Sequence, residues 1–145
     1  LAKQAGLSVQ GYFMIGGPGE TQESALSTIN LMDWMLQKRL VDITHISIAV
    51  PYPGTDLYAN PENYGYTLIS RDFSEYFMNC DAFGAGLPVY ETEKLSRYEL
   101  YVLWEHALAT AARNYRARSK PKVWQEFGDK FMFVNAPATG TAIAA

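Results

Sequence analysis

Two short hydrophobic runs flank one long amphipathic segment in the first fifty residues of the chain. Residues 7–16 (LSVQGYFMIG) gather bulky apolar side chains with little polar interruption, which is typical of a strand buried on both faces. Residues 41–50 are rich in β-branched side chains, and this composition favours a second strand. Residues 25–40 predict a helix with an apolar face of Ala25, Ile29, Met32, Trp34, Met35 and Leu36. This helix is long enough for a right-handed crossover between parallel strands.

The rest of the chain predicts helices and loops rather than further strands of this sheet. Residues 1–6 match the last turn of a helix that ends at Gly6. Residues 56–80, rich in Asn, Asp, Gly and Tyr, predict a loop with short structured pieces. Residues 93–117 predict a long helix with Thr92 as its N-cap, and residues 122–134 a short helix followed by a short strand. Thr21 and Glu20 are alternative candidate caps for the first helix, although Thr21 and Ser24 do not match the usual capping box.

Composition and charge exclude several function classes. The 145 residues carry a net charge of −3 without a basic stripe, which argues against nucleic-acid binding. No apolar run reaches the roughly 18 residues of a membrane span, and the use of one cysteine fits a reducing, cytoplasmic setting. A single cysteine, Cys80, excludes an internal disulfide and any iron–sulfur or zinc site built from thiolates of this chain alone. Because the chain opens on Leu1 within a helix end, we expect a fragment of a longer protein.

Two turns rich in Gly and Pro follow the two predicted strands. The first is GGPGET, residues 16–21, and the second is PYPGT, residues 51–55. Parallel strands direct their carboxyl ends to one edge of a sheet, where α/β proteins bind ligands. The first turn lacks the lysine of a P-loop and the glycine spacing of a dinucleotide-binding loop. From the residues alone, an anion site at Gly16 to Gly19 and a purely structural turn both stay open.

The two turns and the segment between them resemble a known family. GYFMIGGPGET, followed by a helix and then by ISIAVPYPGTDLY, is similar to the C-terminal half of radical S-adenosylmethionine enzymes. The resemblance is greatest to the cobalamin-binding branch, which includes the anaerobic magnesium-protoporphyrin ester cyclase and related methyltransferases. It implies an α/β fold: a fragment of a partial (β/α) barrel, with residues 11–16 and 43–50 as its fifth and sixth strands. A mainly helical C-terminal extension would follow, giving divisions at 1–66, 67–134 and a flexible tail at 135–145.

The resemblance also implies which residues form a cofactor pocket. Ile15, Gly17 and Glu20 match the family's fifth-strand motif, whereas Phe13 stands where the family has glycine. The pocket for the adenine of S-adenosylmethionine would be formed by residues on both turns: Ile15, Gly16, Gly17, Glu20, Ala49 and Pro51. Tyr52, Tyr58 and Cys80 are candidates for substrate contact, and the aromatic residues between Tyr64 and Phe83 are candidates for a substrate pocket or a lid. No catalytic residue is assigned.

Metal-binding residues are not expected in this chain. The family holds a [4Fe–4S] cluster with a CxxxCxxC loop that this sequence lacks. The resemblance therefore implies that the cluster and S-adenosylmethionine, and in the cobalamin-binding branch also cobalamin, belong to a parent protein whose N-terminal part is the partner of this chain. His45 and His106 have no metal-ligand spacing, and Asp42 and Asp56 are weaker candidates for acid–base chemistry than for caps.

Three classes of function remain. The first is a fragment of a radical S-adenosylmethionine oxidoreductase or methyltransferase that supplies the adenine-side wall and part of the substrate site. It would act on a small-molecule substrate only within the parent enzyme. The second is a nucleotide- or small-ligand-binding α/β module that uses the turn from Gly16 to Gly19 as an anion site. The third is a self-associating interaction module, since an incomplete sheet leaves edges and apolar faces open.

Overall fold

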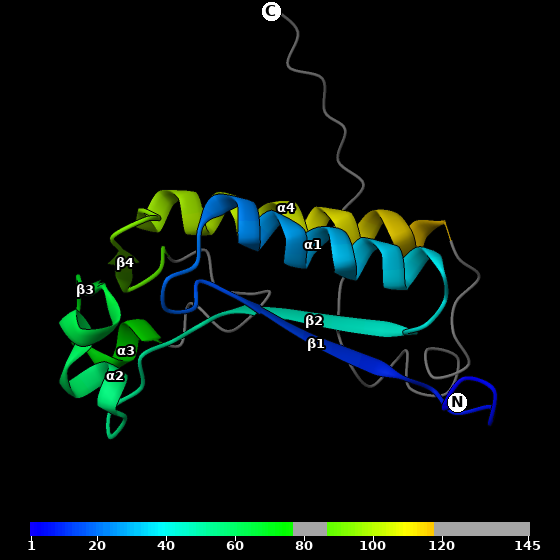
Figure 1. Cartoon of the computed structure of the whole chain (residues 1–145), viewed down its shortest axis with the longest axis horizontal. Coiled ribbons are helices and arrows are strands. Elements are labelled where there is room, and N and C mark those ends of the chain that lie inside the picture. The colour runs from blue at the N-terminus through cyan, green and yellow to red at the C-terminus, as the bar shows by residue number, and fades with distance from the viewer. Residues whose placement is uncertain (77–86, 118–145) are drawn as a thin grey trace, which may run out of the picture.

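The computed structural model describes residues 1–76 and 87–117, and its first half is a β–α–β unit. Strand β1 (Gln10–Ile15) leads into helix α1 (Gln22–Gln37), which returns the chain to strand β2 (Ile43–Ile48). The two strands pair in parallel in an unbroken register, from Gln10 opposite Ile43 to Ile15 opposite Ile48. Figure 1 shows the strands side by side below the helix. The prediction of an α/β chain with a parallel pair and a crossover helix is confirmed.

Short elements and one long helix complete the described part. They are α2 (Asp56–Ala59), the 3-10 helix η1 (Pro61–Tyr64), β3 (Tyr66–Leu68), α3 (Phe73–Tyr76), β4 (Tyr90–Thr92) and α4 (Arg97–Arg116). Strands β3 and β4 form a second, antiparallel sheet in which Tyr66 lies opposite Thr92 and Leu68 opposite Tyr90. The short pieces predicted after residue 56 are therefore present. Residues 122–134, the tail and Cys80 lie outside the described residues, so the predictions for them stay predictions.

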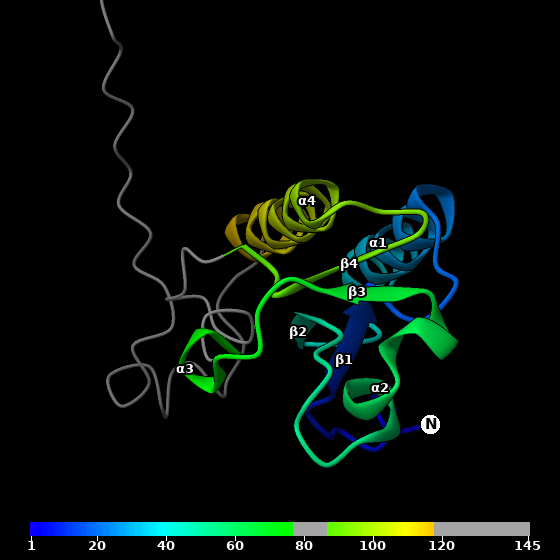
Figure 2. The ribbon, with the colours of Figure 1, turned by 90° about the vertical axis from the view of Figure 1, so that its left-hand side faces the viewer.

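Both long helices pack on the same face of the parallel pair, as Figure 2 shows with the strands seen nearly end-on. In α1 the buried positions are Ala25, Ile29, Met32 and Leu36, which repeat at helical spacing. In α4, Trp104 donates its indole N–H to the carbonyl oxygen of Ile46 at 3.1 Å. One hydrophobic cluster joins residues of β1, α1, β2, β3, β4 and α4. The predicted division between residues 66 and 67 stays a prediction, because a shared core neither requires nor excludes it.

In the described part of the chain the other face of the parallel pair is open, which corrects the expectation of a strand buried on both faces. Tyr12 and Met14 are 73% and 60% exposed, whereas Ile15 is fully buried. Side chains alternate along a strand, and α1 and α4 cover only the face that Ile15 shares. Trp34 was also expected on the apolar face of α1, but it is 50% exposed because it lies on the side of the helical wheel opposite to the buried positions Ile29, Met32 and Leu36.

The starts of the two long helices differ from the sequence prediction. Thr21 and Ser24 do form a capping box, with the Ser24 amide donating to the Thr21 hydroxyl oxygen at 3.2 Å and the Thr21 amide to the Ser24 hydroxyl oxygen at 2.9 Å. Ser24 occupies the third position of the helix, which is usually Glu or Gln in a capping box. Helix α4 begins at Arg97 rather than at residue 93, because Ser96 and Glu99 form its capping box. Thr92, the predicted cap, instead ends β4.

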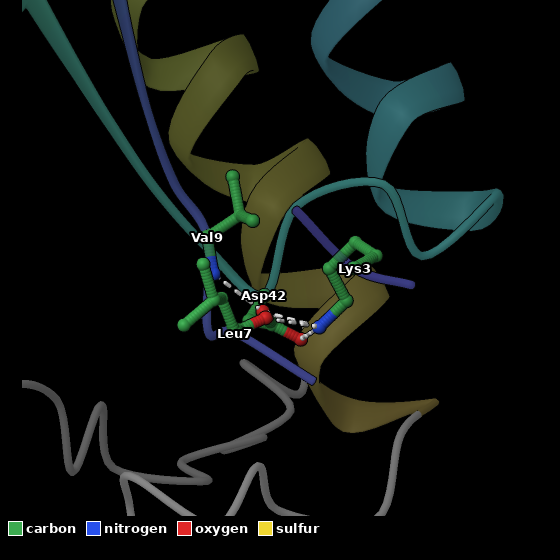
Figure 3. A network of polar contacts seen from close by, with 4 residues as sticks. All are labelled: Lys3, Leu7, Val9 and Asp42. Atoms are coloured by element: carbon green, nitrogen blue, oxygen red, sulfur yellow. Dashed lines mark hydrogen bonds and ion pairs between the residues drawn. The ribbon is translucent and has the colours of Figure 1, made fainter. Parts of the chain in front are cut away.

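The amino ends of β1 and β2 are tied together by Asp42. Its carboxylate accepts hydrogen bonds from the ammonium group of Lys3 at 2.7 Å and from the Val9 amide at 2.7 Å, as drawn in Figure 3. Lys3 also donates to the carbonyl oxygen of Leu7. The turn that carries Lys3 ends at Gly6. The φ of Gly6 is 78°, and its amide donates a hydrogen bond to the Lys3 carbonyl oxygen, which is the geometry predicted for a helix end. Asp42 thus has a structural partner set at the edge opposite to the two Gly/Pro turns.

Candidate functional site at the carboxyl ends of the parallel strands

The two Gly/Pro turns leave the same edge of the parallel sheet. Ile15 and Ile48 are register partners, and the Ala49 amide donates to the Ile15 carbonyl oxygen at 2.8 Å just beyond the last pair. Ile15, Ala49 and Pro51 are all buried, with exposed fractions of 7% or less. The structure therefore brings the sequence-selected residues of both turns to one rim, which is where α/β folds carry ligand sites.

Gly16 is the residue at which the first turn leaves the sheet. Its φ is 80°, in the left-handed region that favours glycine. Its amide donates to the carboxylate of Glu20, and its carbonyl oxygen accepts hydrogen bonds from the hydroxyl groups of Tyr66 and Tyr90, the latter at 2.9 Å. A second bond, from the Glu20 amide to the Gly17 carbonyl oxygen at 3.1 Å, tightens the turn. Side chains thus satisfy both polar groups of the Gly16 backbone.

The carboxylate of Glu20 occupies the Gly16 amide, which an anion bound in this turn would need. In an anion-binding turn the free amides point at the ligand. Here the Gly16 amide already holds the negative charge of Glu20, and Pro18 has no amide hydrogen to offer. A phosphate at the Gly16 amide would meet the carboxylate of Glu20. The geometry therefore favours a turn closed by its own acid over a phosphate cradle.

Tyr66 was expected only as one of the aromatic residues of a substrate pocket or lid, and Tyr90 is a site residue that the sequence analysis missed. Their rings stack with centroids 4.6 Å apart, and only 3% and 1% of their surfaces are exposed. Burial, with a smaller contribution from the charge of Glu20, raises the pKa of Tyr66 to about 12, although its hydrogen bond to Tyr90 opposes the shift. Burial likewise raises the pKa of Tyr90 above its usual value. Both hydroxyl groups therefore stay protonated at neutral pH and act as donors.

The backbone of the turn is accessible beyond Gly16. Gly17 is half-buried and Gly19 is exposed, and a methyl group on either would meet no atom within 4 Å. Lys94 donates to the carbonyl oxygen of Gly19 at 3.3 Å from the loop before α4. A shallow hollow of about 290 Å³ lies beside Gly19 and has Glu62, Glu93 and Lys94 on its walls. The turn therefore presents backbone, not long side chains, at the rim.

The substrate candidates on the second turn gather around a different residue. The rings of Tyr52 and Tyr58 lie 6.4 and 6.3 Å from the ring of Tyr76. The guanidinium group of Arg71 stands 4.8 Å above the ring of Tyr58. Tyr52 is 43% exposed, so this aromatic group keeps an accessible edge. Tyr52 and Tyr58 thus belong together, in one aromatic group around Tyr76.

The remaining sequence candidates do not form a metal site. His45 is exposed on the open face of the sheet, 5.7 Å from the ring of Tyr12, and His106 is exposed on α4. Among residues 1–76 and 87–117, no group of three or more His, Cys, Asp or Glu side chains has the geometry to hold a metal ion. Because Cys80 is the sole thiol of the chain, these residues do not fit a [4Fe–4S] cluster.

Over the described ranges, no helix has the length and apolar character needed to cross a membrane. No protein-family model matches the chain. A stretch of 75 residues is 39% identical to a protein of Pyrococcus horikoshii that is named an uncharacterized methyltransferase. This stretch is 50% of the chain, and it spans only 16% of the length of that relative. Half of the chain is therefore similar to a small part of a protein that is named as a methyltransferase.

Proposed function

We propose that this chain is the C-terminal barrel segment of a radical S-adenosylmethionine enzyme and supplies the adenine-side wall of its cofactor pocket. The observation that carries the proposal is the parallel β1–α1–β2 unit with both Gly/Pro turns at one rim. The similarity to a protein named as a methyltransferase supports methyl transfer over oxidoreduction as the parent reaction. The partial barrel, and cobalamin as a second cofactor, are parts of this proposal.

Each residue of the rim has a distinct part in the proposed pocket. Gly17 leaves the backbone of the turn open, so that the adenine can approach it closely, and Gly16 leaves room for the Tyr90 hydroxyl behind it. Glu20 closes the turn through the Gly16 amide. The side chains of Ile15 and Ala49 are buried, so they support the wall from behind. Pro51 ends the second strand in the same layer.

The reactive group of such an enzyme has to come from elsewhere in the polypeptide. When bound, a [4Fe–4S] cluster would supply the electron that cleaves S-adenosylmethionine, but the residues of this chain do not fit it. No step of the reaction is therefore assigned to this chain. Its proposed work is to bind and orient the adenosyl part and to form part of the substrate site.

The test is the polypeptide that carries this chain. We expect a CxxxCxxC segment on its N-terminal side, separated from Leu1 by several β–α units. With its cluster reconstituted under anaerobic, reducing conditions, that polypeptide should cleave S-adenosylmethionine, whereas the 145-residue chain alone should not. An initiating methionine just before Leu1, with no such segment, would refute the proposal.

Calorimetry separates the proposal from a phosphate-binding module. S-adenosylmethionine, ATP and inorganic phosphate are titrated into the carrying polypeptide and into its Glu20→Gln variant. The proposal requires binding that depends on the adenosyl group. Binding of inorganic phosphate as tight as that of S-adenosylmethionine, and tighter still once the Glu20 charge is removed, would favour the anion site.

A further inference from the structure

The backbone of Gly16 needs hydrogen-bond partners from outside the parallel sheet. The register of β1 and β2 ends at Ile15, whose carbonyl oxygen accepts a hydrogen bond from the Ala49 amide. Gly16 follows directly and lies beyond this register. Gly16 is nevertheless buried. A buried carbonyl without a partner is costly. Its partners are therefore part of what fixes the turn.

Those partners come from the small antiparallel sheet. Tyr66 opens β3 and Tyr90 opens β4, so the pairing of these two strands brings both rings to the same side. The two rings stack and both hydroxyl groups donate to the Gly16 carbonyl oxygen. The Tyr90 hydroxyl also occupies the space that a methyl group at Gly16 would need. The small sheet thus contacts the first turn through two hydrogen bonds and through close packing of Tyr90 against Gly16.

We infer that Tyr66 and Tyr90 are positioning residues for the cofactor pocket. They hold the Gly16 peptide in one orientation, and this sets the path of the accessible backbone at Gly17 and Gly19. The inference rests on the proposed function for what the turn binds, but the positioning itself does not depend on any ligand. It makes the β3–β4 sheet part of the site, although this sheet lies outside the β1–α1–β2 unit.

Removing the hydroxyl groups tests the inference directly. The variants are Tyr66→Phe, Tyr90→Phe and the double variant, which keep the ring stack but leave the carbonyl with one donor or none. Tyr64→Phe is the matched control, because its exposed hydroxyl donates to Asp56 at 2.6 Å and not to Gly16. Amide hydrogen exchange is followed in the 145-residue chain at Gly16 and Glu20, whose amides are hydrogen-bonded within the turn, with the amides of α1 and α4 as an internal reference.

We expect exchange at the turn to rise about three- to tenfold in each single variant, and more in the double variant, relative to the amides of α1 and α4. Tyr64→Phe should leave the turn unchanged. An unchanged turn in the double variant would overturn the inference. So would a rise spread evenly over both helices, because it would mean a general loss of stability. If Tyr90→Phe does not fold, Tyr66→Phe decides alone, because it keeps the Tyr90 hydroxyl and removes one donor. An unchanged turn in this variant would then overturn the inference.

A second measurement asks whether the turn matters for the cofactor. In the carrying polypeptide, the dissociation constant of S-adenosylmethionine should rise in Tyr66→Phe by a factor similar to the change in exchange, and stay constant in Tyr64→Phe. Faster amide exchange at the turn with unchanged affinity for S-adenosylmethionine would overturn the inference that the tyrosines position the cofactor pocket. If even the unaltered polypeptide fails to bind S-adenosylmethionine, the proposed function fails, while the exchange result still decides whether the tyrosines fix the turn.

Discussion

At the scale of single residues, the three glycines of the first turn have different tasks. Gly16 and Gly19 have φ values of 80° and 73°, whereas Gly17 has an ordinary negative-φ backbone. A methyl group would overlap the Tyr90 hydroxyl at Gly16 but would meet open space at Gly17 and Gly19. The same substitution at each position therefore separates backbone strain from steric overlap.

We predict that Gly16→Ala is the most damaging of the three alanine substitutions. It adds left-handed strain to overlap in a packed site and should lower the free energy of unfolding by about 2–5 kcal/mol. Gly19→Ala should cost only the strain, about 1–2 kcal/mol. Gly17→Ala should be neutral or slightly stabilising. Urea unfolding followed by circular dichroism measures all three, and equal losses at Gly16 and Gly19 would contradict the steric role of Tyr90.

The buried tyrosine pair predicts a loss of stability at alkaline pH. Burial raises the pKa of Tyr66 from 10.0 to about 12, so the folded state favours the protonated hydroxyl. The contribution of this group is complete below pH 10 and is lost as the pH rises through about 12. Unfolding measured between pH 8 and 12 should show a fall in free energy that is smaller in the Tyr66→Phe/Tyr90→Phe variant. Parallel pH profiles for the two proteins would contradict this prediction.

At the scale of elements, α4 is fastened to the rest of the core at several points. Trp104 bonds to β2, and Asn114 donates to the carboxylate of Asp33 in α1 at 2.6 Å. Arg113 approaches the same carboxylate at 3.4 Å. Burial acts to raise the pKa of Asp33, but its hydrogen bonds to Asn114 and Gln37 and the charge of Arg113 lower it below the usual value. These contacts align α1 and α4 over one face of the sheet.

Two tryptophans allow a matched test of how α4 docks. Trp104→Phe removes the donor to the buried Ile46 carbonyl and should lower the free energy of unfolding by about 1–3 kcal/mol. Trp34→Phe changes a half-exposed side chain on α1 and should stay within about 0.5 kcal/mol of the unaltered chain. Chemical denaturation followed by far-ultraviolet circular dichroism compares them. Similar effects at the two positions would argue against the role given to Trp104.

At the scale of the whole molecule, the parallel pair is incomplete within the described residues. Each of its two strands has one hydrogen-bonded neighbour there, and Tyr12 and Met14 are exposed on its open face. Unpaired strand edges and exposed apolar side chains favour association with other chains. In the proposed parent enzyme, further strands would take up these edges.

We therefore predict that the 145-residue chain self-associates. Its weight-average mass in sedimentation equilibrium should rise with protein concentration. Met14→Lys places a charge on the open face and should shift the equilibrium towards monomer. Thr67→Lys, on an exposed position of the other sheet, is the control and should have little effect. A monomer at every concentration would refute the prediction.

Local patterns were enough to predict the elements of the first half of the chain and the common edge of its two turns. Hydrophobic spacing marks strands and helices because it follows the backbone repeat, and a parallel pair joined by one helix leaves little choice of topology. The helix starts were less predictable. Ser24 replaces the expected acid in one capping box, and the cap of α4 depended on whether Thr92 joined a strand.

The sequence by itself determined the β–α–β unit, the glycines that its first turn requires, and the lack of cysteines for a cluster. Only the tertiary structure decided which side chains hold that turn. The two tyrosines that bond to Gly16 lie 50 and 74 residues away from it, beyond the reach of any local pattern. It also decided which face of the strands stays open, because that depends on α1 and α4 packing together on one side.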